Sequence, residues 1–318
     1  MKTGNILLVI LALSALAANS VLCRLALGDT LIDPVSFTLV RLGSGILILM
    51  LILARVRKRE QQRVSIPVEH RSLLDGIPVV KRWSQRFSDR SKDLLSVLSS
   101  RGGNRAAIML FVYAICFSVA YLDLDTGTGA LILFGSVQLT MIAYSLIKGQ
   151  KLALMEWLGL LIAFAGFIYL VLPGLSTPSL MGFVLMTLAG IAWGFYTLAG
   201  KESNDPVADT AANFFRTWPL LLLTGIWLLW QGAEMTPKGF LLALISGAIT
   251  SGLGYVLWYR VLRLFTATQA GVLQLLVPVI AAMGGVIFVA EPVTINLVIA
   301  SVAILGGITL VIYGRKPV

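Results

Sequence analysis

Apolar runs of about 20 residues recur along almost the whole chain and leave few folds open. Of its 318 residues, 58% are hydrophobic and only 13% are charged, whereas a soluble domain carries about 25% charged residues. A 20-residue helix is about 30 Å long, which matches the hydrocarbon core of a bilayer. Barrel strands would alternate apolar and polar residues over about 10 positions, and this pattern is absent. The sequence therefore predicts an all-α integral membrane protein.

Ten transmembrane helices are expected. Their ranges are 5–26, 33–54, 105–122, 125–147, 153–172, 179–200, 208–230, 238–258, 267–289 and 294–313. The first range also has the layout of a secretory signal peptide, because Lys2 precedes an apolar core that ends in Ala15-Leu16-Ala17. Its similarity to residues 182–203, described next, favours a retained helix.

An internal repeat divides the chain into two halves. Residues 126–171 align without a gap on residues 266–311, and 11 of the 46 aligned positions are identical. About 4 or 5 identities are expected by chance in so apolar a composition. Residues 4–26 align on residues 182–203 in the same way. The predicted halves are 1–172 and 173–318, each with five spans.

The first half carries a basic insertion at about 55–104. The two alignments are offset by 178 and 140 positions, so the first half is 38 residues longer (178 − 140) between its first and fourth helices. Residues 55–105 hold 13 Lys or Arg against 5 Asp or Glu. Apolar residues recur there at helical spacing, at Val80, Trp83, Phe87, Leu94 and Leu98. This pattern predicts a basic helix on anionic lipid; the alternative is a solvated insertion without a fold of its own.

The distribution of charge predicts the orientation. Most Lys and Arg fall in loops on one side of the ten spans, which places both termini in the cytoplasm and the chain in the cell (inner) membrane. The same one-sidedness argues against a nucleic-acid partner, despite a net charge of +10. Because each half has five helices, the second half is expected to be inverted relative to the first. Inverted repeats are typical of secondary transporters, whose substrate site lies near mid-membrane between the halves.

Two arginines inside the spans are candidate functional residues. Arg41 and Arg216 each follow an Asp-Pro start in the second helix of their half. A charge at this depth is costly unless it is paired or hydrated, which favours a function. The alternative is an arginine that binds backbone carbonyls or reaches the interface.

Other polar and aromatic residues within the spans are candidates for lining a cavity. Asn19, Gln138 and Gln274 carry amides that need partners in hydrocarbon, and helix-to-helix hydrogen bonding is the alternative to a substrate role. Trp193, Tyr196 and Tyr255 complete the set of substrate-binding candidates. For Tyr255, Trp258 and Tyr259, a belt at the membrane interface is also a consistent reading and the favoured one.

Pro278 is a candidate gate. It lies within the ninth expected span, where a proline frees a carbonyl and kinks the helix; a static packing kink is the alternative. Glu156, near a helix start, is either a proton carrier or a carboxylate favoured by the helix dipole.

The sequence gives no sign of enzymatic chemistry. Cys23 and Cys116 lack metal-type spacing, and His70 is the only histidine. No phosphate-binding loop for ATP is present. We therefore expect no metal, no cofactor and no catalytic residue. The polar residues are also too few for a continuous channel.

Four segments carry a resemblance to a known family: RLGSG (41–45), GTGALILFGSVQ (127–138), AWGFYTLAGK (192–201) and VLQLLVPVIAA (272–282). Together with the ten short-looped helices, the chain resembles the EamA-domain proteins of the drug/metabolite transporter superfamily. The resemblance covers nearly everything except residues 55–104. It implies a bundle around a central cavity near Asn19, Gln138, Trp193, Tyr196, Tyr255 and Gln274. It also implies efflux or exchange of small solutes, amino acids among them.

Two hypotheses of function follow. The first is a secondary transporter for a small metabolite that works by alternating access, driven by a proton gradient or by the gradient of the substrate itself. The second is a membrane receptor or assembly subunit that acts through the basic 55–105 loop.

Overall fold

The computed structural model describes residues 3–64, 96–149, 153–171, 178–201, 203–265 and 273–314. These residues are helical except for turns, short loops and one isolated β-bridge between Ile32 and Met235. The elements are α1 (Thr3–Leu27), α2 (Pro34–Val64), α4 (Asn104–Ala120), α5 (Thr126–Ile147), α6 (Leu154–Val171), α7 (Leu180–Lys201), α8 (Pro206–Phe215), α9 (Trp218–Gln231), α10 (Pro237–Ile245), the π-helix η1 (Ser246–Leu253), α11 (Gly254–Leu262), α13 (Leu276–Gly284), the π-helix η2 (Gly285–Val289) and α14 (Ile295–Gly314).

Several helices are long and apolar enough to cross a bilayer. Five such segments lie in the described residues: Gly4–Leu27, Pro34–Lys58, Thr126–Tyr144, Leu180–Lys201 and Pro237–Leu262. Four shorter apolar helices accompany them, at Asn104–Ala120, Leu154–Gly166, Leu276–Val289 and Ile295–Val311. The chain is therefore an all-helical, multi-pass membrane protein.

Three helices begin with the same local device. Asp33, Asp205 and Thr236 each precede a proline, and each side chain accepts a hydrogen bond from a backbone N–H of the first turn. Such a cap satisfies an N–H group that has no partner within the helix, and proline at the first position already has a helical φ. These motifs fix where α2, α8 and α10 begin.

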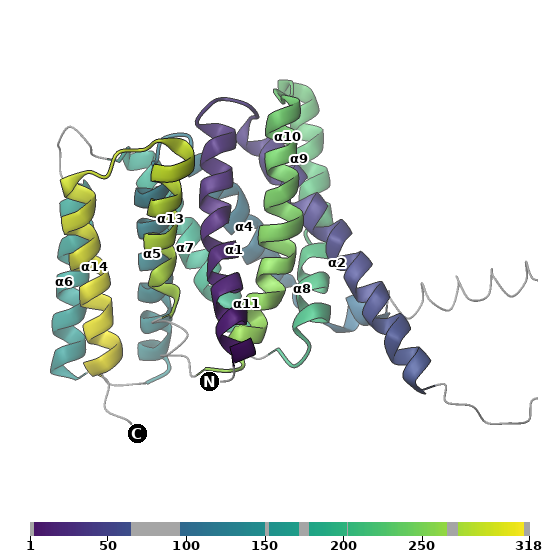
Figure 1. Cartoon of the computed structure of the whole chain (residues 1–318), viewed down its shortest axis with the longest axis horizontal. Helices are drawn as coiled ribbons and strands as arrows, with labels where there is room; N and C mark the ends of the chain where they lie inside the picture. The colour runs from purple at the N-terminus through teal and green to yellow at the C-terminus, as the bar shows by residue number, and fades with distance from the viewer. Residues whose placement is uncertain are drawn as a thin grey trace, which may run out of the picture.

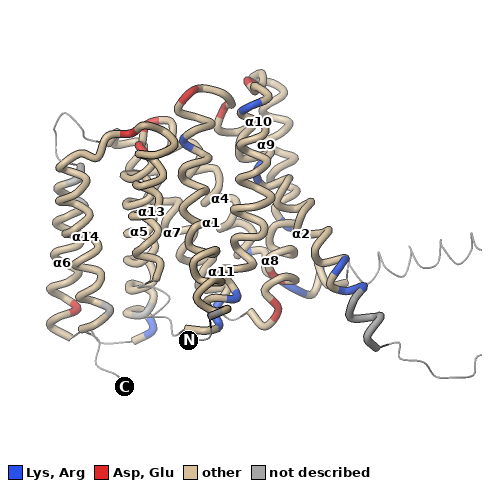
Figure 2. Tube along the Cα trace, viewed as in Figure 1, with Lys and Arg blue, Asp and Glu red and all other residues tan. Residues whose placement is uncertain are grey.

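Acidic residues gather at one end of the bundle, which we call the acidic end (Figure 2). Here Arg24, near the end of α1, contacts Asp125, just before α5. The N–H of Asp33 before α2 donates to the carbonyl of Glu234 after α9. Ser179 before α7 donates to Asp123 after α4. The ends of α1, α4 and α9 thus lie at the same end of the bundle as the starts of α2, α5 and α7.

The opposite end of the bundle, which we call the basic end, holds the other ends of these helices. Arg57 of α2 forms an ion pair of 3.8 Å with Asp205 before α8. Arg263 after α11 donates to the carbonyl of Asn204 in the same turn. The start of α1 and the end of α14 also lie at this end (Figure 1).

Helices that occupy equal places in the two sequence halves run in opposite directions. α1 ends and α7 begins at the acidic end, whereas α2 begins and α9 ends there. α4 and α5 likewise oppose the α10–α11 segment and α13, respectively. α6 opposes α14, because Tyr169 near the end of α6 donates to Asn296 at the start of α14. This last pair packs together at the margin of the bundle (Figure 1).

Three expected ranges differ in detail. α2 continues to Val64, so the insertion begins as an extension of this helix. The seventh range divides into α8 and α9 at Arg216 and Thr217, and the eighth contains η1. Most of the basic helix expected at 80–98 lies outside the described residues. Leu98, expected to face lipid, is instead buried in the protein core.

Candidate functional site

Arg41 lies at the centre of a buried polar group of side chains. It projects from α2, and only 1% of its surface is exposed. Its Nε donates to Ser251 Oγ on η1 at 2.9 Å. Its Nη2 donates to the hydroxyls of Tyr113 on α4 and Tyr255 on α11, both at 2.9 Å. One guanidinium therefore joins helices of both halves of the chain.

The partners of Arg41 are neutral. None of the ion pairs found among the described residues involves Arg41. The guanidinium carbon also lies 5.2 Å from the ring centre of Tyr113 and 4.9 Å from that of Phe117, within cation–π range. Burying an unpaired charge costs several kcal/mol, which hydrogen bonds and ring contacts offset only in part.

Asn19 of α1 binds the same π-helix. Its Oδ1 accepts hydrogen bonds from Ser246, Thr250 and Ser251, at 3.0, 2.6 and 3.1 Å. A π-helix bonds each residue to the one five positions on, so Ser246 and Ser251 lie one turn apart on one face. The wide turn of η1 thereby aims three hydroxyls at a single amide oxygen.

Close contact between η1 and α2 depends on Gly247. A Cβ atom at this position would overlap the carbonyl oxygen of Arg41 and the hydroxyl of Ser44. Glycine therefore lets the two helix backbones touch beside the site, as small residues do in membrane bundles.

Aromatic rings cover the side of the group that faces α7. The ring of Trp193 lies 4.8 Å from that of Tyr113, 4.6 Å from that of Tyr255 and 5.3 Å from that of Tyr196. These distances are typical of favourable ring pairs. The favoured expectation of an interfacial belt at Tyr255, Trp258 and Tyr259 is wrong, because packing inside the protein leaves each at most 1% exposed.

We call these six residues the Arg41 cluster: Asn19, Arg41, Tyr113, Trp193, Ser251 and Tyr255. Three of its nitrogen atoms are buried without a hydrogen-bond partner in the described part of the chain: Asn19 Nδ2, Arg41 Nη1 and Trp193 Nε1. Buried donors are nearly always paired in proteins, so three within one connected cluster call for an explanation.

The remaining amide candidates are both buried. Gln138 is buried on α5, and the adjacent Val137 and Thr140 face Gly194 of α7, beside Trp193. Gln274 is 1% exposed, and its Nε2 has no partner within the described ranges.

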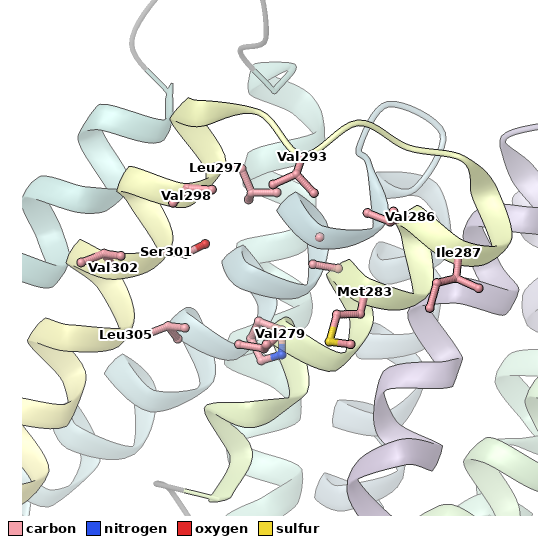
Figure 3. A pocket seen from close by; sticks show the side chains of 13 residues that line it. Val279, Met283, Val286, Ile287, Val293, Leu297, Val298, Ser301, Val302 and Leu305 are labelled. Atoms are coloured by element: carbon pink, nitrogen blue, oxygen red, sulfur yellow. The ribbon is translucent and has the colours of Figure 1, made fainter.

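Pro278 lies away from the cluster. It lines an apolar groove of about 660 Å³ between α13 and α14, where Ser301 is the one polar residue among the 13 that line it (Figure 3). The helix is interrupted at Leu275, three residues before Pro278. Because proline has no N–H, the carbonyl of Gln274 loses its helical partner, which accounts for the break.

A second polar group closes the acidic end. Arg24 Nε donates to Glu291 Oε1 at 3.1 Å, and its Nη1 donates to the carbonyls of Tyr121 and Leu122. The other oxygen of Glu291 accepts the N–H of Thr126 at 2.8 Å. Both charged side chains are largely buried, at 20% and 10% exposure. We call the pair of Arg24 and Glu291 the acidic-end latch.

Arg216 binds backbone carbonyls, which was the structural alternative to a functional role for this residue. It ends α8 and donates to the carbonyls of Leu98, Ser99 and Arg101 and to Oδ1 of Asn104. Glu156 likewise accepts the N–H of Ala153 at the start of α6, as a carboxylate favoured by the helix dipole does.

Sequence reasoning missed Tyr113, Ser251 and Phe117. Tyr113 carries the one phenol in the apolar run of α4, and Ser251 lies in the Ser/Thr/Gly-rich stretch 246–252. A polar group inside an expected span is the signal that points to Tyr113 and Ser251, whereas the apolar Phe117 gives no such signal. Within the described residues, no group of three or more His, Cys, Asp or Glu side chains has the arrangement of a metal site.

Known proteins resemble this chain at two levels. The EamA-like transporter family matches residues 180–313. An uncharacterized protein of Pseudomonas aeruginosa is 42% identical over 312 residues, which are 98% of this chain and 95% of that protein. A solved crystal structure superposes with a TM-score of 0.61 at 16% identity and covers 98% of both chains, so the likeness is one of fold.

More distant relatives are named as transporters. An uncharacterized transporter of Archaeoglobus fulgidus is 24% identical over 64% of this chain and 74% of its own length. A probable amino-acid metabolite efflux pump of Salmonella typhimurium is 22% identical over 72% of this chain and 81% of its own. The expected resemblance is thus confirmed, and the chain belongs to the EamA-like transporter family.

Proposed function

We propose that this protein is a secondary transporter that exports or exchanges a small metabolite across the cytoplasmic membrane by alternating access. The Arg41 cluster is the observation that carries the proposal. It joins helices of both halves deep inside the protein, and it keeps three donors unpaired. Membrane transporters place their substrate sites at such interfaces.

The proposed architecture is two inverted five-helix repeats, at residues 1–172 and 173–318, with the insertion in the first. The opposite directions of α1 and α7, and of the other four pairs of equivalent segments, support it. The positions of the N-terminal start of α1 and the end of α14, at the basic end, support cytoplasmic termini.

Alternating access requires contacts at the two ends that break in turn. The acidic-end latch joins α1 to the segment between η2 and α14, and so joins the two halves. The ion pair of Arg57 with Asp205 joins the halves at the other end. Pro278 is the proposed gating point between them, because the helix is already interrupted there.

Transport by purified protein in liposomes tests this function. A panel of labelled metabolites is loaded inside, and exit is followed with and without a proton gradient, which separates proton coupling from exchange. The Arg41→Gln variant is expected to lose transport, whereas Arg216→Gln, whose arginine binds backbone carbonyls, keeps it. Folded wild-type protein that moves no member of the panel would count against the proposal.

Deletion of residues 65–95 addresses the alternative of a receptor or assembly subunit. The transporter proposal expects transport to continue, because the described hydrogen-bond partners of Arg41 come from α4, η1 and α11. A further arm with and without anionic lipid tests the proposed contact between the basic loop and the membrane.

A further inference from the structure

We propose that the Arg41 cluster binds an organic monoanion, a single carboxylate on a compact apolar or aromatic body without an ammonium group. The inference rests on the proposed function, because it names the class of substrate that the transporter carries. It excludes amino-acid zwitterions and free amines as the preferred ligands.

The charge of the cluster is the first step. The guanidinium of Arg41 is 1% exposed, and its hydrogen-bond partners are the neutral hydroxyls of Tyr113, Ser251 and Tyr255. The described residues supply Arg41 with no carboxylate partner. A buried positive charge is most stable beside a negative one, so a bound anion would supply the missing counter-charge.

The unpaired atoms of the cluster are the second step. Asn19 Nδ2, Arg41 Nη1 and Trp193 Nε1 all carry N–H groups, and none can accept a hydrogen bond. An ionised carboxylate is the matching group, since it only accepts and offers about four lone-pair sites on two oxygens. Arginine also binds carboxylates through two parallel hydrogen bonds.

The third step concerns the hydrogen-bond acceptor of Asn19, which the protein itself already occupies. Oδ1 of Asn19 already accepts from Ser246, Thr250 and Ser251. An ammonium group has three donors and no acceptor. A zwitterion would therefore bring an ammonium into a site whose free groups are donors and whose charge is positive. Sites with mismatched buried polar groups reject such ligands strongly.

Aromatic rings indicate the rest of the ligand. Trp193 contacts Tyr113 and Tyr255 at ring distances of 4.8 and 4.6 Å, and Tyr196 stacks on Trp193 at 5.3 Å. A flat or branched apolar body packs well against such rings, whereas a polyhydroxylated body would leave its hydroxyls unpaired.

The experiment uses three probes of nearly equal shape: 3-phenylpropionate, phenylalanine and 3-phenylpropanamide. The full chain is placed in lipid nanodiscs, and thermal unfolding is measured against probe concentration. A ligand that binds only the folded state raises the unfolding temperature. We expect the propionate to raise it at a concentration at least about tenfold lower than the other two, because its binding forms charge-assisted hydrogen bonds.

The central variant is Asn19→Asp. It keeps an oxygen for the three hydroxyls, replaces the unpaired Nδ2 and places a negative charge in the cluster. It is expected to weaken propionate binding roughly tenfold to a hundredfold. Trp193→Phe, which keeps a ring and removes the N–H, is a second variant with an expected loss of about tenfold. Arg216→Gln is the matched control and binds as the wild type does.

Three outcomes would overturn the inference: equal stabilisation by phenylalanine, equal stabilisation by the amide, or unchanged propionate binding in both Asn19→Asp and Trp193→Phe. Failure of the proposed function looks different. If the propionate binds with this selectivity but no labelled carboxylate crosses liposomes, the site stands and the transporter proposal fails. If liposomes export amines or zwitterions alone, the transporter stands and this inference fails.

Discussion

Arg24 Nε lies 3.1 Å from Glu291 Oε1, and this contact joins the end of α1 to the segment that follows η2. The two residues are 267 positions apart and belong to different halves of the chain. Backbone groups extend the contact, since Glu291 accepts the N–H of Thr126 and Arg24 binds the carbonyl of Tyr121. The latch therefore ties helices α1, α4 and α5 together at the acidic end.

The latch predicts how access to the interior changes. Arg24→Gln removes the ion pair, and Cys23, the adjacent and fully buried residue, becomes the reporter. In a Cys116→Ser background, a membrane-impermeant maleimide added at the acidic end should label Cys23 about tenfold faster, because a charge-assisted hydrogen bond contributes about 1.5 kcal/mol or more.

Lys238→Gln is the control for this labelling, since Lys238 is an exposed cation in the first turn of α10, at the same end of the bundle. Its labelling rate should equal that of the parent protein. Equal rates in Arg24→Gln and Lys238→Gln would show that the ion pair does not hold the acidic end closed.

The close contact at Gly247 predicts that a larger side chain there lowers the stability of the protein. Gly247→Ala places a methyl group against the carbonyl of Arg41 and the hydroxyl of Ser44, so α2 and η1 must separate. Overpacking of this kind destabilises by about 1–3 kcal/mol, and thermal unfolding in nanodiscs should show a lower midpoint. Gly43→Ala on α2 is the control, because its Cβ would meet nothing within 4 Å. An equal loss of stability in both variants would show that the contact at Gly247 is not the cause, because alanine favours the helix over glycine at both positions.

The helical class of the fold was predictable because lipid leaves the chain few options. Apolar runs, Asp-Pro starts and glycines mark most helix boundaries to within a few residues, as at α2 and α8. The insertion was visible as an offset between two alignments. Breaks inside helices were harder to foresee. The π-helix η1 packs on α2 at Gly247, and no local pattern in Ser246–Leu253 specifies its wider turn.

Arg41, the centre of the candidate site, was predictable from the sequence, because a charge inside an apolar span has a high free-energy cost. Its partners were not, because Tyr113 and Ser251 reach it from 72 and 210 positions away. The burial of Trp258 and Tyr259 also depends on tertiary packing. A tyrosine near a helix end has the same sequence signature whether lipid or Tyr196 covers its ring.

The turn before α4 predicts a local change in hydrogen exchange. The N–H of Gly103 donates to Asn213 Oδ1 at 3.0 Å, which fixes the turn on α8. Asn213→Ala removes this acceptor, so the Gly103 amide should exchange about fivefold faster, as expected for the loss of a bond worth about 1 kcal/mol. Hydrogen exchange with mass spectrometry of peptides that span residues 100–106 measures this change.

Asn204→Ala is the matched control for that measurement. Asn204 is exposed, and its contact with Arg263 uses the backbone carbonyl, which the substitution keeps. Unchanged exchange in Asn213→Ala would show that the remaining contacts of Arg216 hold the turn without it.

The helix break before Pro278 predicts that a substitution there changes the transport rate but not ligand binding. Pro278→Ala restores an N–H that can donate to the carbonyl of Gln274, so the helix should continue through Leu275. If the interruption is the hinge between the two access states, transport in liposomes falls severalfold while the binding of 3-phenylpropionate stays unchanged, because Pro278 lies in the lateral groove and not in the Arg41 cluster. Pro237→Ala, at the first position of α10 where the missing N–H costs nothing, should leave both intact. Normal turnover in Pro278→Ala would make the break a static feature of packing and move the search for the hinge to η1.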